Sequence, residues 1–299
     1  MEPADGLDPD SASAALTSQQ STDEPVWTAE RPRLLTLGYR MLGSWHDAED
    51  VVQEAGLRWA SADRGDVETP GAYLTTIVTR LSIDRLRARQ RSIETYVGPW
   101  LPEPVASERL PDDLAADGSS LSLATLHLME RMTPPERAAY VLREGFSYSF
   151  REIGAILDRT ESGVRQLFHR ARGRVGERAR FQADPREHER LLRAVIDASR
   201  AGDIEELERE LHDQVVLWSD GGGKTAAAIN PIYGPSKVAR FLAGIYGRQP
   251  SEFVLAEVNG LPAFEVTGPN GRRIIALGLV DGKVAGVYMV ANPDKLSYV

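Results

Sequence analysis

Leucine and methionine side chains recur every three or four positions in the run that ends at Gly43, which is the spacing of an amphipathic helix. Ser44 stands where it can cap a second helix, whose apolar positions again follow a helical period. Thr69 and Pro70 supply a cap and a first-turn proline for a third helix that runs to about residue 90. The pattern predicts an all-α unit of three helices over residues 27–92.

A second helical unit is predicted over residues 119–181. Thr133 and Glu136 have capping-box spacing, and Ser149 and Glu152 repeat it before a short helix. A break at 158–160 precedes a longer helix with an apolar stripe on one side and many arginines on the other. A short helix, a tight turn and an arginine-rich helix form a helix-turn-helix pattern.

The chain changes character over residues 186–299. Two helices come first, and alternating strand-like segments follow, with one further helix expected at 235–246. Asn270-Gly271 and Asp281-Gly282 are typical of hairpin turns. The pattern predicts an α+β domain with a curved antiparallel sheet, and hence a multidomain fold of two all-α domains and one α+β domain.

Two segments are predicted to lie outside these units. Residues 1–26 are rich in Asp, Ser, Ala, Pro and Thr and have few large apolar groups, which favours a disordered acidic tail. Residues 93–118 form a proline-rich linker, stiffened where prolines fix φ. Trp100 and Leu101 stand in this linker, although large apolar side chains need a surface to bury against.

Composition narrows the function classes. The 299 residues carry a net charge of -9, include no cysteine, and hold five scattered histidines without metal-ligand spacing. We therefore expect no metal and no cofactor. The longest apolar run, 274–280, is too short to span a bilayer, and the first residues do not resemble a signal peptide, so we expect no membrane contact and a cytoplasmic location.

The charged residues are distributed unevenly. Arginines gather near the end of the third helix and along the helix-turn-helix, where guanidinium groups suit phosphates and guanine edges. The second helix instead carries an acidic strip, which indicates a basic partner. Each charged face could also be no more than a solvated helix surface.

Specific motifs resemble the extracytoplasmic-function sigma factors. Region 2 of that family is similar to YRMLG (39–43), DAEDVVQE (47–54), PGAYL (70–74) and LSIDRLR (81–87), and region 4 is similar to TPPER (133–137) and VRQLFHRAR (164–172). WLPEP (100–104), DGGGK (220–224) and NPDKL (292–296) resemble a subgroup with a C-terminal SnoaL-like domain, a cone-shaped fold of the nuclear-transport-factor-2-like superfamily.

The resemblance implies partners and residues. The partners would be core RNA polymerase, through its β′ clamp helices and β flap, and promoter DNA, with polymerase performing the chemistry. The residues implied for core-polymerase binding are Asp47, Asp50, Gln53, Glu54 and Leu57. Those implied for the -10 element, where a base is flipped out, are Arg64, Asp66, Thr69, Tyr73, Arg80, Asp84 and Arg87. Those implied for the -35 element are Thr160, Ser162, Arg165, Gln166, His169, Arg170 and Arg172.

One position departs from the family pattern. Relatives usually carry a large side chain where this chain has Gly56, and a glycine in mid-helix costs about 1 kcal/mol. We expect this departure to weaken the polymerase-binding surface.

The resemblance also implies that the C-terminal domain regulates the chain in cis, in place of a separate anti-sigma protein. Our hypothesis is that Trp100 and Leu101 dock near the 220–224 turn. The residues of this interdomain set are Trp100, Leu101, Pro102, Asp220, Gly222, Lys224, Asn292 and Asp294. The alternative is that Trp100 rests on its own helical domain.

Two other functions stay open at this stage. The chain could be a one-component DNA-binding regulator with a ligand-sensing domain, or a SnoaL-like isomerase or cyclase that carries DNA-binding helices. The cup of such an enzyme would be lined by Trp218, Asp220, Lys224, Tyr233, Glu257 and Asn259. Three glycines follow Asp220, which favours a tight turn over an acid-base pair and argues against the enzyme.

Overall fold

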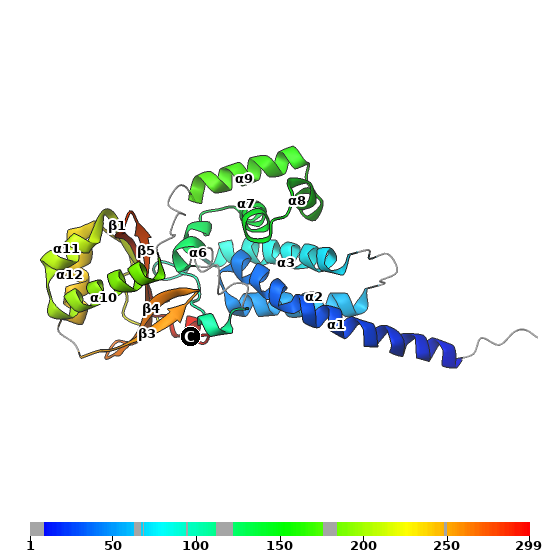
Figure 1. The fold of residues 1–299 in the computed structure, drawn as a ribbon, viewed down its shortest axis with the longest axis horizontal. Helices are drawn as coiled ribbons and strands as arrows, with labels where there is room; N and C mark the ends of the chain where they lie inside the picture. Colours follow the sequence, from blue (N-terminus) through cyan, green and yellow to red (C-terminus); the bar gives the residue numbers. More distant parts are fainter. Residues whose placement is uncertain are drawn as a thin grey trace, which may run out of the picture.

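Three helices form the N-terminal unit of the computed structural model, which describes residues 9–62, 67, 69–93, 95–111, 122–175, 184–247 and 250–299 (Figure 1). They are α1 (Pro9–Leu42), α2 (Trp45–Ser61) and α3 (Pro70–Ile93). Gly43 ends α1 with a φ of 64°, and the Ser44 side chain accepts a hydrogen bond from the amide of Asp47. The predicted end of α1 and the predicted cap of α2 are therefore present.

Helix α1 begins within the segment that the sequence analysis assigned to the N-terminal tail. Residues 1–26 were expected to be disordered, yet α1 is helical from Pro9 onward, and residues 1–8 lie outside the described part. The alanines and straight-chain residues of this stretch are good helix formers. Extending a helix that packing already holds needs no new nucleus. The expectation of a disordered tail over residues 1–26 stays a prediction.

The second helical unit contains the predicted helix-turn-helix. Its elements are α6 (Leu123–Met129), α7 (Pro134–Tyr140), a π-helical turn η2 (Val141–Gly145), α8 (Phe150–Leu157) and α9 (Glu161–Val175). Capping boxes open α7 and α8, as predicted. Asp158 has a φ of 53°, so this residue in the left-handed region ends α8 before α9 begins.

The C-terminal domain combines helices with one sheet. Helices α10 (Pro185–Ala201), α11 (Ile204–Glu210) and α12 (Pro235–Tyr246) accompany strands β1 (Leu211–Asp220), β2 (Ile232–Tyr233), β3 (Glu252–Val258), β4 (Leu261–Gly268), β5 (Gly271–Val280) and β6 (Lys283–Val290). Among the described residues the sheet has six strands in the order β2-β1-β6-β5-β4-β3. We call this part the sheet domain.

The sheet is mixed, and the expectation of an antiparallel sheet is corrected. Strands β3 to β6 are antiparallel neighbours, whereas β1 pairs with β6 in parallel. Tight turns force antiparallel pairing between consecutive strands. The β1 strand reaches β6 only after α12 and the other strands, so no turn fixes its direction.

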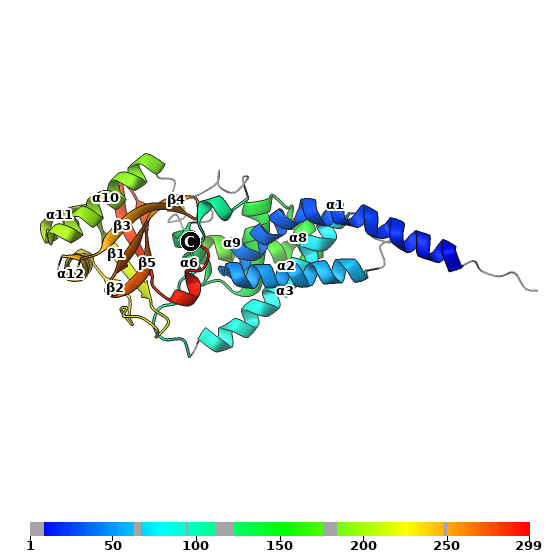
Figure 2. The same ribbon diagram turned by 90° about the horizontal axis from the view of Figure 1, so that it is seen from below.

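Hydrophobic cores join the parts of the chain. The two helical units share one core, in which side chains from α1, α2 and α3 meet those of α7, α8 and α9. One face of the sheet packs on α10, α11 and α12. The other face packs on α6 and on the linker residue Leu101, so the sheet lies between two layers (Figures 1 and 2).

Residues 95–111 of the linker run between the sheet domain and the helical units. They include the 3₁₀ turn η1 (Ser107–Arg109), and Ala106 forms a bridge with Val258 at the end of β3. A second short turn, η4 (Pro293–Lys295), lies near the chain end. The expected linker spanned residues 93–118, of which residues 94 and 112–118 lie outside the described part.

Candidate polymerase, promoter and interdomain surfaces

The acidic strip of α2 is a solvent-accessible ridge, which we define as Asp47, Asp50, Gln53, Glu54 and Leu57. Gln53 and Glu54 are exposed, and 66% of Leu57 is accessible. Arg85 on α3 donates to Asp47 at 2.9 and 2.7 Å and to Asp50 at 3.0 Å. The structure therefore brings together all five residues expected for core polymerase, and one cation already borders the ridge.

One flank of the ridge is covered by two aromatic residues from other parts of the chain. The Tyr298 hydroxyl donates to Glu49 at 2.9 Å, and its ring lies 6.4 Å from that of Trp45. Trp27 of α1 lies over Gly56, where an added Cβ would be 2.8 Å from the indole. The space left by the missing side chain at position 56 is thus occupied by a different residue.

Helix α3 carries most of the residues expected at the -10 element. Tyr73 packs on Trp59, with ring centroids 5.9 Å apart, and Asp84 pairs with Arg87 at 3.1 Å. Thr69 is exposed at the start of the helix. The Arg80 side chain donates to the Ile156 carbonyl of α8 at 3.2 Å, so part of this helix is in contact with the second helical unit. Arg64 and Asp66 lie outside the described residues.

Helix α9 presents its polar side to solvent. Val164, Leu167 and Ala171 are buried beneath it. The exposed residues expected at the -35 element are Thr160, Ser162, Arg165, Gln166, His169, Arg170 and Arg172. Thr160 caps the helix by accepting from the Gly163 amide at 3.2 Å. Arg170 donates to Glu136 at 3.0 Å, so one of these cations is held against α7.

A buried ion cluster joins the two helical units. Glu130, in the loop after α6, accepts from Arg137 at 2.5 Å and from Arg89 of α3 at 2.8 Å. Arg137 also donates to the Arg40 carbonyl at 3.1 Å. Burial acts to raise the pKa of Glu130, but the two guanidinium groups prevail and lower it. The carboxylate is therefore charged and fixes one unit on the other.

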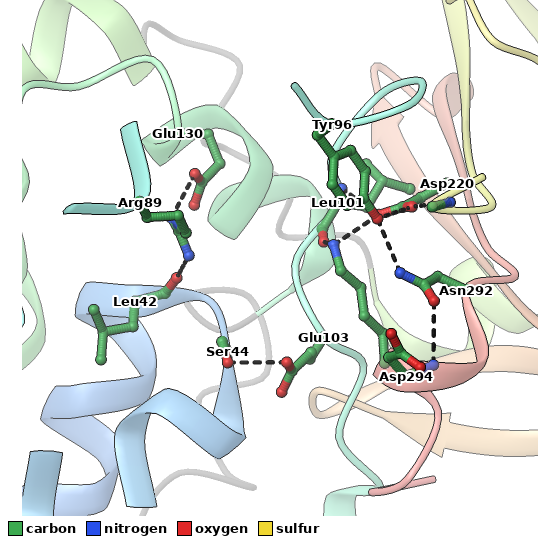
Figure 3. Close-up of polar contacts among 12 residues, drawn as sticks. Leu42, Ser44, Arg89, Tyr96, Leu101, Glu103, Glu130, Asp220, Asn292 and Asp294 are labelled. Carbon is green, nitrogen blue, oxygen red and sulfur yellow. Dashed lines mark hydrogen bonds and ion pairs between the residues drawn. The ribbon is translucent and has the colours of Figure 1, made fainter. Parts of the chain in front are cut away.

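The linker and the sheet domain meet at Asp220, which is fully buried (Figure 3). Its carboxylate accepts from the Leu101 amide at 2.8 Å, the Tyr96 hydroxyl at 2.5 Å and Lys295 at 2.7 Å. The Gly222 amide adds a bond at 3.1 Å. Lys295 also donates to the Leu101 carbonyl, so both backbone groups of Leu101 are bound.

Trp100 contacts two cations. The Arg89 guanidinium is 4.2 Å from the ring centroid, and the Lys295 ammonium is 3.8 Å from it. Arg89 belongs to the helical units and Lys295 to the sheet domain. Trp100 thus contacts both the helical units and the sheet domain, the two surfaces that the sequence analysis offered as alternatives.

The remaining residues of the interdomain set surround this contact. Asn292 donates to the Tyr96 hydroxyl at 3.0 Å, and Lys224 pairs with Asp294 at the surface. Gly222 has a φ of 57°, and an added Cβ would lie 2.4 Å from the Asn292 amide. Pro102 is buried next to Leu101. The structure therefore brings the whole set to one place.

Burial shifts the pKa values of several groups at these contacts. It lowers the pKa of Lys295 to about 8, although Asp220 opposes the change. It raises the pKa of Tyr96, whose neighbour Asp220 acts in the same direction. On the α6 side of the sheet, burial lowers the pKa of His127 to about 4. That ring lies 4.8 Å from Trp218 and 5.6 Å from Tyr288 between centroids.

A second contact between linker and sheet domain lies at the β3–β4 turn. Asn259 and Gly260 have φ values of 57° and 76°, as in a two-residue hairpin turn. The Asn259 amide donates to the Val105 carbonyl at 2.9 Å, its side-chain oxygen accepts from the Val105 amide at 3.1 Å, and its side-chain nitrogen donates to Tyr39 at 2.6 Å. Asn259 therefore has a structural role that we did not predict.

The residues that sequence reasoning missed at these contacts are Tyr39, Glu103, Tyr96, Asn259, Lys295 and Tyr298. Asn259-Gly260 is an Asn-Gly pair between strands and could have been recognised as a turn. Lys295 lies inside the quoted NPDKL motif. Tyr39 and Glu103 likewise lie inside the quoted YRMLG and WLPEP motifs. Tyr96 and Tyr298 have no local signal, because each depends on a partner far away in the sequence.

The proposed enzyme cup does not form around Asp220. That carboxylate is enclosed by its four donors and has no exposure to solvent. Tyr233, by contrast, is 62% exposed at the edge of the sheet. A cavity of about 60 Å³ is lined by Trp218, Tyr288 and neighbouring residues, and Asp220 is not among them. The described residues contain no group of three or more His, Asp or Glu arranged to hold a metal ion.

Comparisons with known proteins cover most of the chain. The sigma-70 region 2 family matches residues 26–92, and the sigma-70 region 4 family matches residues 122–175. The ECF RNA polymerase sigma factor SigJ of Mycobacterium tuberculosis is 38% identical over 288 residues, which is 90% of this chain and 91% of that protein. This chain belongs to the ECF sigma factors.

Other matches agree with this assignment. The probable ECF sigma factor SigI of the same species is 28% identical and covers 93% of this chain and 96% of that protein. The crystal structure of SigJ superimposes with a TM-score of 0.72 at 34% identity, covering 91% of this chain and 98% of that one. A further match is an ntf2-like protein of unknown function from Mesorhizobium loti (15% identity, 36% of this chain and 93% of that one, TM-score 0.29).

Within this ECF sigma factor, the N-terminal unit is region 2 and the helix-turn-helix unit is region 4. The family is one of transcription initiation factors, so the chain is a promoter-recognition protein and the one-component alternative is not favoured. In the described part of the chain, no helix combines the length and the apolar character that crossing a bilayer requires.

Proposed function

We propose that this sigma factor binds core polymerase through the ridge of α2, reads promoter DNA through α3 and α9, and is regulated in cis by its sheet domain. The observation that carries the proposal is the bond between Asp220 and the Leu101 amide. It joins the regulatory domain directly to the linker between regions 2 and 4.

The ridge suits a basic protein surface. The carboxylates of Asp50 and Glu54 are exposed and lie beside the exposed Leu57, which would supply an apolar contact, whereas Asp47 is half-buried. Complementary charge speeds association and fixes orientation. We propose the β′ clamp helices of polymerase as the partner of the ridge and the β flap as the partner of region 4.

The helices proposed to contact DNA differ in accessibility. The polar side of α9 is exposed and can enter a major groove, where arginine and glutamine read base edges. Arg80 of α3 is bonded to the Ile156 carbonyl of region 4, and the two regions share a core. We propose that this is a closed arrangement and that -10 recognition requires region 4 to move away from α3.

The contacts between the sheet domain and the linker support a regulatory role for this domain. The linker binds the sheet domain through Leu101 and Trp100, which contact the ion pair of Asp220 with Lys295. Helix α6 of region 4 packs on the same face of the sheet. Opening regions 2 and 4 would disturb these contacts. We propose that the domain thereby takes the place of a separate anti-sigma protein and acts without catalysis, because Asp220 has no access to a substrate.

Two experiments test the proposal separately. For polymerase binding, Asp50→Asn combined with Glu54→Gln should weaken the affinity for core polymerase at least tenfold, measured by fluorescence anisotropy, while Glu205→Gln on the exposed α11 should not. Unchanged affinity of the double variant would reject the ridge. For regulation, Asp220→Asn should change promoter-specific transcription by the reconstituted holoenzyme, and Asp213→Asn, which changes an exposed residue of β1 outside the interdomain set, should not. Equal transcription from all forms would reject control in cis.

A further inference from the structure

Glu103 of the linker caps the helix that carries the polymerase ridge. Its side chain is 9% exposed and reaches the N-terminus of α2. One carboxylate oxygen accepts from the Ser44 hydroxyl at 2.9 Å, as Figure 3 shows. The other accepts from the backbone amides of Trp45 and His46, at 2.8 and 3.2 Å.

These bonds complete a cap that α2 cannot supply from its own residues. The first amides of a helix have no partner inside the helix. Ser44 accepts from the Asp47 amide, and Glu103 accepts from the amides of the two preceding residues, Trp45 and His46. A carboxylate at this end also interacts favourably with the helix dipole. The cap lies in the turn that holds Asp47, the first ridge residue.

The backbone of Glu103 is also fixed to region 2. Its amide donates to the Gly43 carbonyl at 2.8 Å, and its carbonyl accepts from the Tyr39 hydroxyl at 2.6 Å. Two residues earlier, Leu101 is bound by the sheet domain at both its amide and its carbonyl. Two residues span at most about 7 Å, and Pro102 between them has a fixed φ. The cap and the sheet-domain contact therefore belong to one short, stiff segment.

We propose that Glu103 is a positioning residue for polymerase binding. It orders the first turn of α2, and the ordered turn presents Asp47 and Asp50 to polymerase. Glu103 caps this turn as long as the linker is bound to the sheet domain. The inference rests on the proposed role of the ridge. It gives the sheet domain a direct connection to the polymerase-binding helix, through three consecutive linker residues.

The first test measures the cap itself. Hydrogen exchange of the Trp45 and His46 amides is compared in the full-length wild type, Glu103→Gln, Glu103→Ala and the control Glu108→Gln, which changes an exposed glutamate of the same linker. Loss of an N-cap weakens a helix end by a factor of about five or more. Exchange should therefore accelerate at least fivefold in Glu103→Ala, less in Glu103→Gln, and not in the control.

The second test measures the consequence for polymerase. In reconstituted transcription, the sigma concentration needed for half-maximal activity should rise at least fivefold in Glu103→Ala, while the rate at saturating sigma stays that of the wild type. Glu103→Gln, which keeps one acceptor oxygen, should recover part of the effect. A general loss of folding would lower the saturating rate as well, and thermal unfolding of each variant identifies that case.

Unchanged amide exchange in both Glu103 variants would overturn the inference, as would faster exchange with no change in half-saturation. Failure of the proposed function is distinguishable from this. In that case Asp50→Asn with Glu54→Gln would leave the affinity for core polymerase unchanged, whereas the exchange experiment on free protein would still report whether Glu103 holds the turn.

Discussion

The ammonium group of Lys295 lies 3.8 Å from the centre of the Trp100 ring and donates at the same time to the buried carboxylate of Asp220. A cation between an aromatic face and a carboxylate is held from two sides. Arg89, which also bonds Glu130, lies 4.2 Å from the centre of the same ring. Region 2, region 4, the linker and the sheet domain are thus connected through one side chain.

Lys295→Met should destabilise the protein strongly. Removing one partner of a buried pair typically costs about 3–5 kcal/mol, because the other charge is left without compensation. Lys224→Met is the matched control, since the pair of Lys224 with Asp294 is exposed and such pairs contribute about 0–1 kcal/mol. Urea unfolding of both variants gives the two values. Equal losses would show that the buried pair is not important.

Acid should weaken the packing of α6 on the sheet. Burial lowers the pKa of His127 from 6.5 to about 4, so the docked form binds fewer protons than the undocked form between these values. Its contribution to stability is complete above pH 6.5 and is lost as the pH falls towards 4. Unfolding free energies measured across this range should fall less steeply for His127→Phe than for the wild type. Parallel curves would contradict this assignment.

Gly222→Ala should disrupt the linker contact. The residue has a φ of 57°, and the new methyl group would lie 2.4 Å from the Asn292 amide, which holds Tyr96. Gly202→Ala is the control, because Gly202 has a φ of 70° with nothing within 4 Å of an added Cβ. Both variants carry the backbone strain of about 1–2 kcal/mol. Any additional loss in Gly222→Ala, measured by thermal unfolding, reports the clash.

Gly56→Ala should fail to stabilise α2. Alanine normally stabilises a helix interior by about 1 kcal/mol over glycine, and Gly173→Ala on α9, where nothing lies within 4 Å, should show that gain. At position 56 the methyl group would meet Trp27 at 2.8 Å, so we expect a loss instead. In a Trp27→Ala background the same change should become stabilising. A double-mutant cycle without coupling would reject this packing.

Local chemistry explains what the sequence predicted well. The capping boxes of Thr133 with Glu136 and Ser149 with Glu152 depend only on neighbours in the chain, and they place α7 and α8 correctly. The left-handed turn at Asp281 and Gly282 is similarly local. These signals locate the helix-turn-helix and one hairpin before any tertiary contact is known.

Contacts between distant residues explain what the sequence did not predict. The parallel pairing of β1 with β6 and the two-residue strand β2 depend on packing and have no turn signal. The contact between Leu101 and Asp220 could be anticipated from motifs, but the role of Glu103 as a cap on α2 could not, because Ser44 lies 59 positions earlier in the chain. Trp27 over Gly56 is of the same kind.

The bond between Leu101 and Asp220 joins two parts of a single polypeptide. Its equilibrium is therefore unimolecular, and dilution of the protein leaves the docked fraction unchanged. With an inhibitor on a second chain, the inhibited fraction would depend on the amounts of both proteins, which vary from cell to cell. Under the proposed control in cis, every newly made molecule carries its own regulatory domain in a ratio of one to one, so the docked fraction would not depend on expression level.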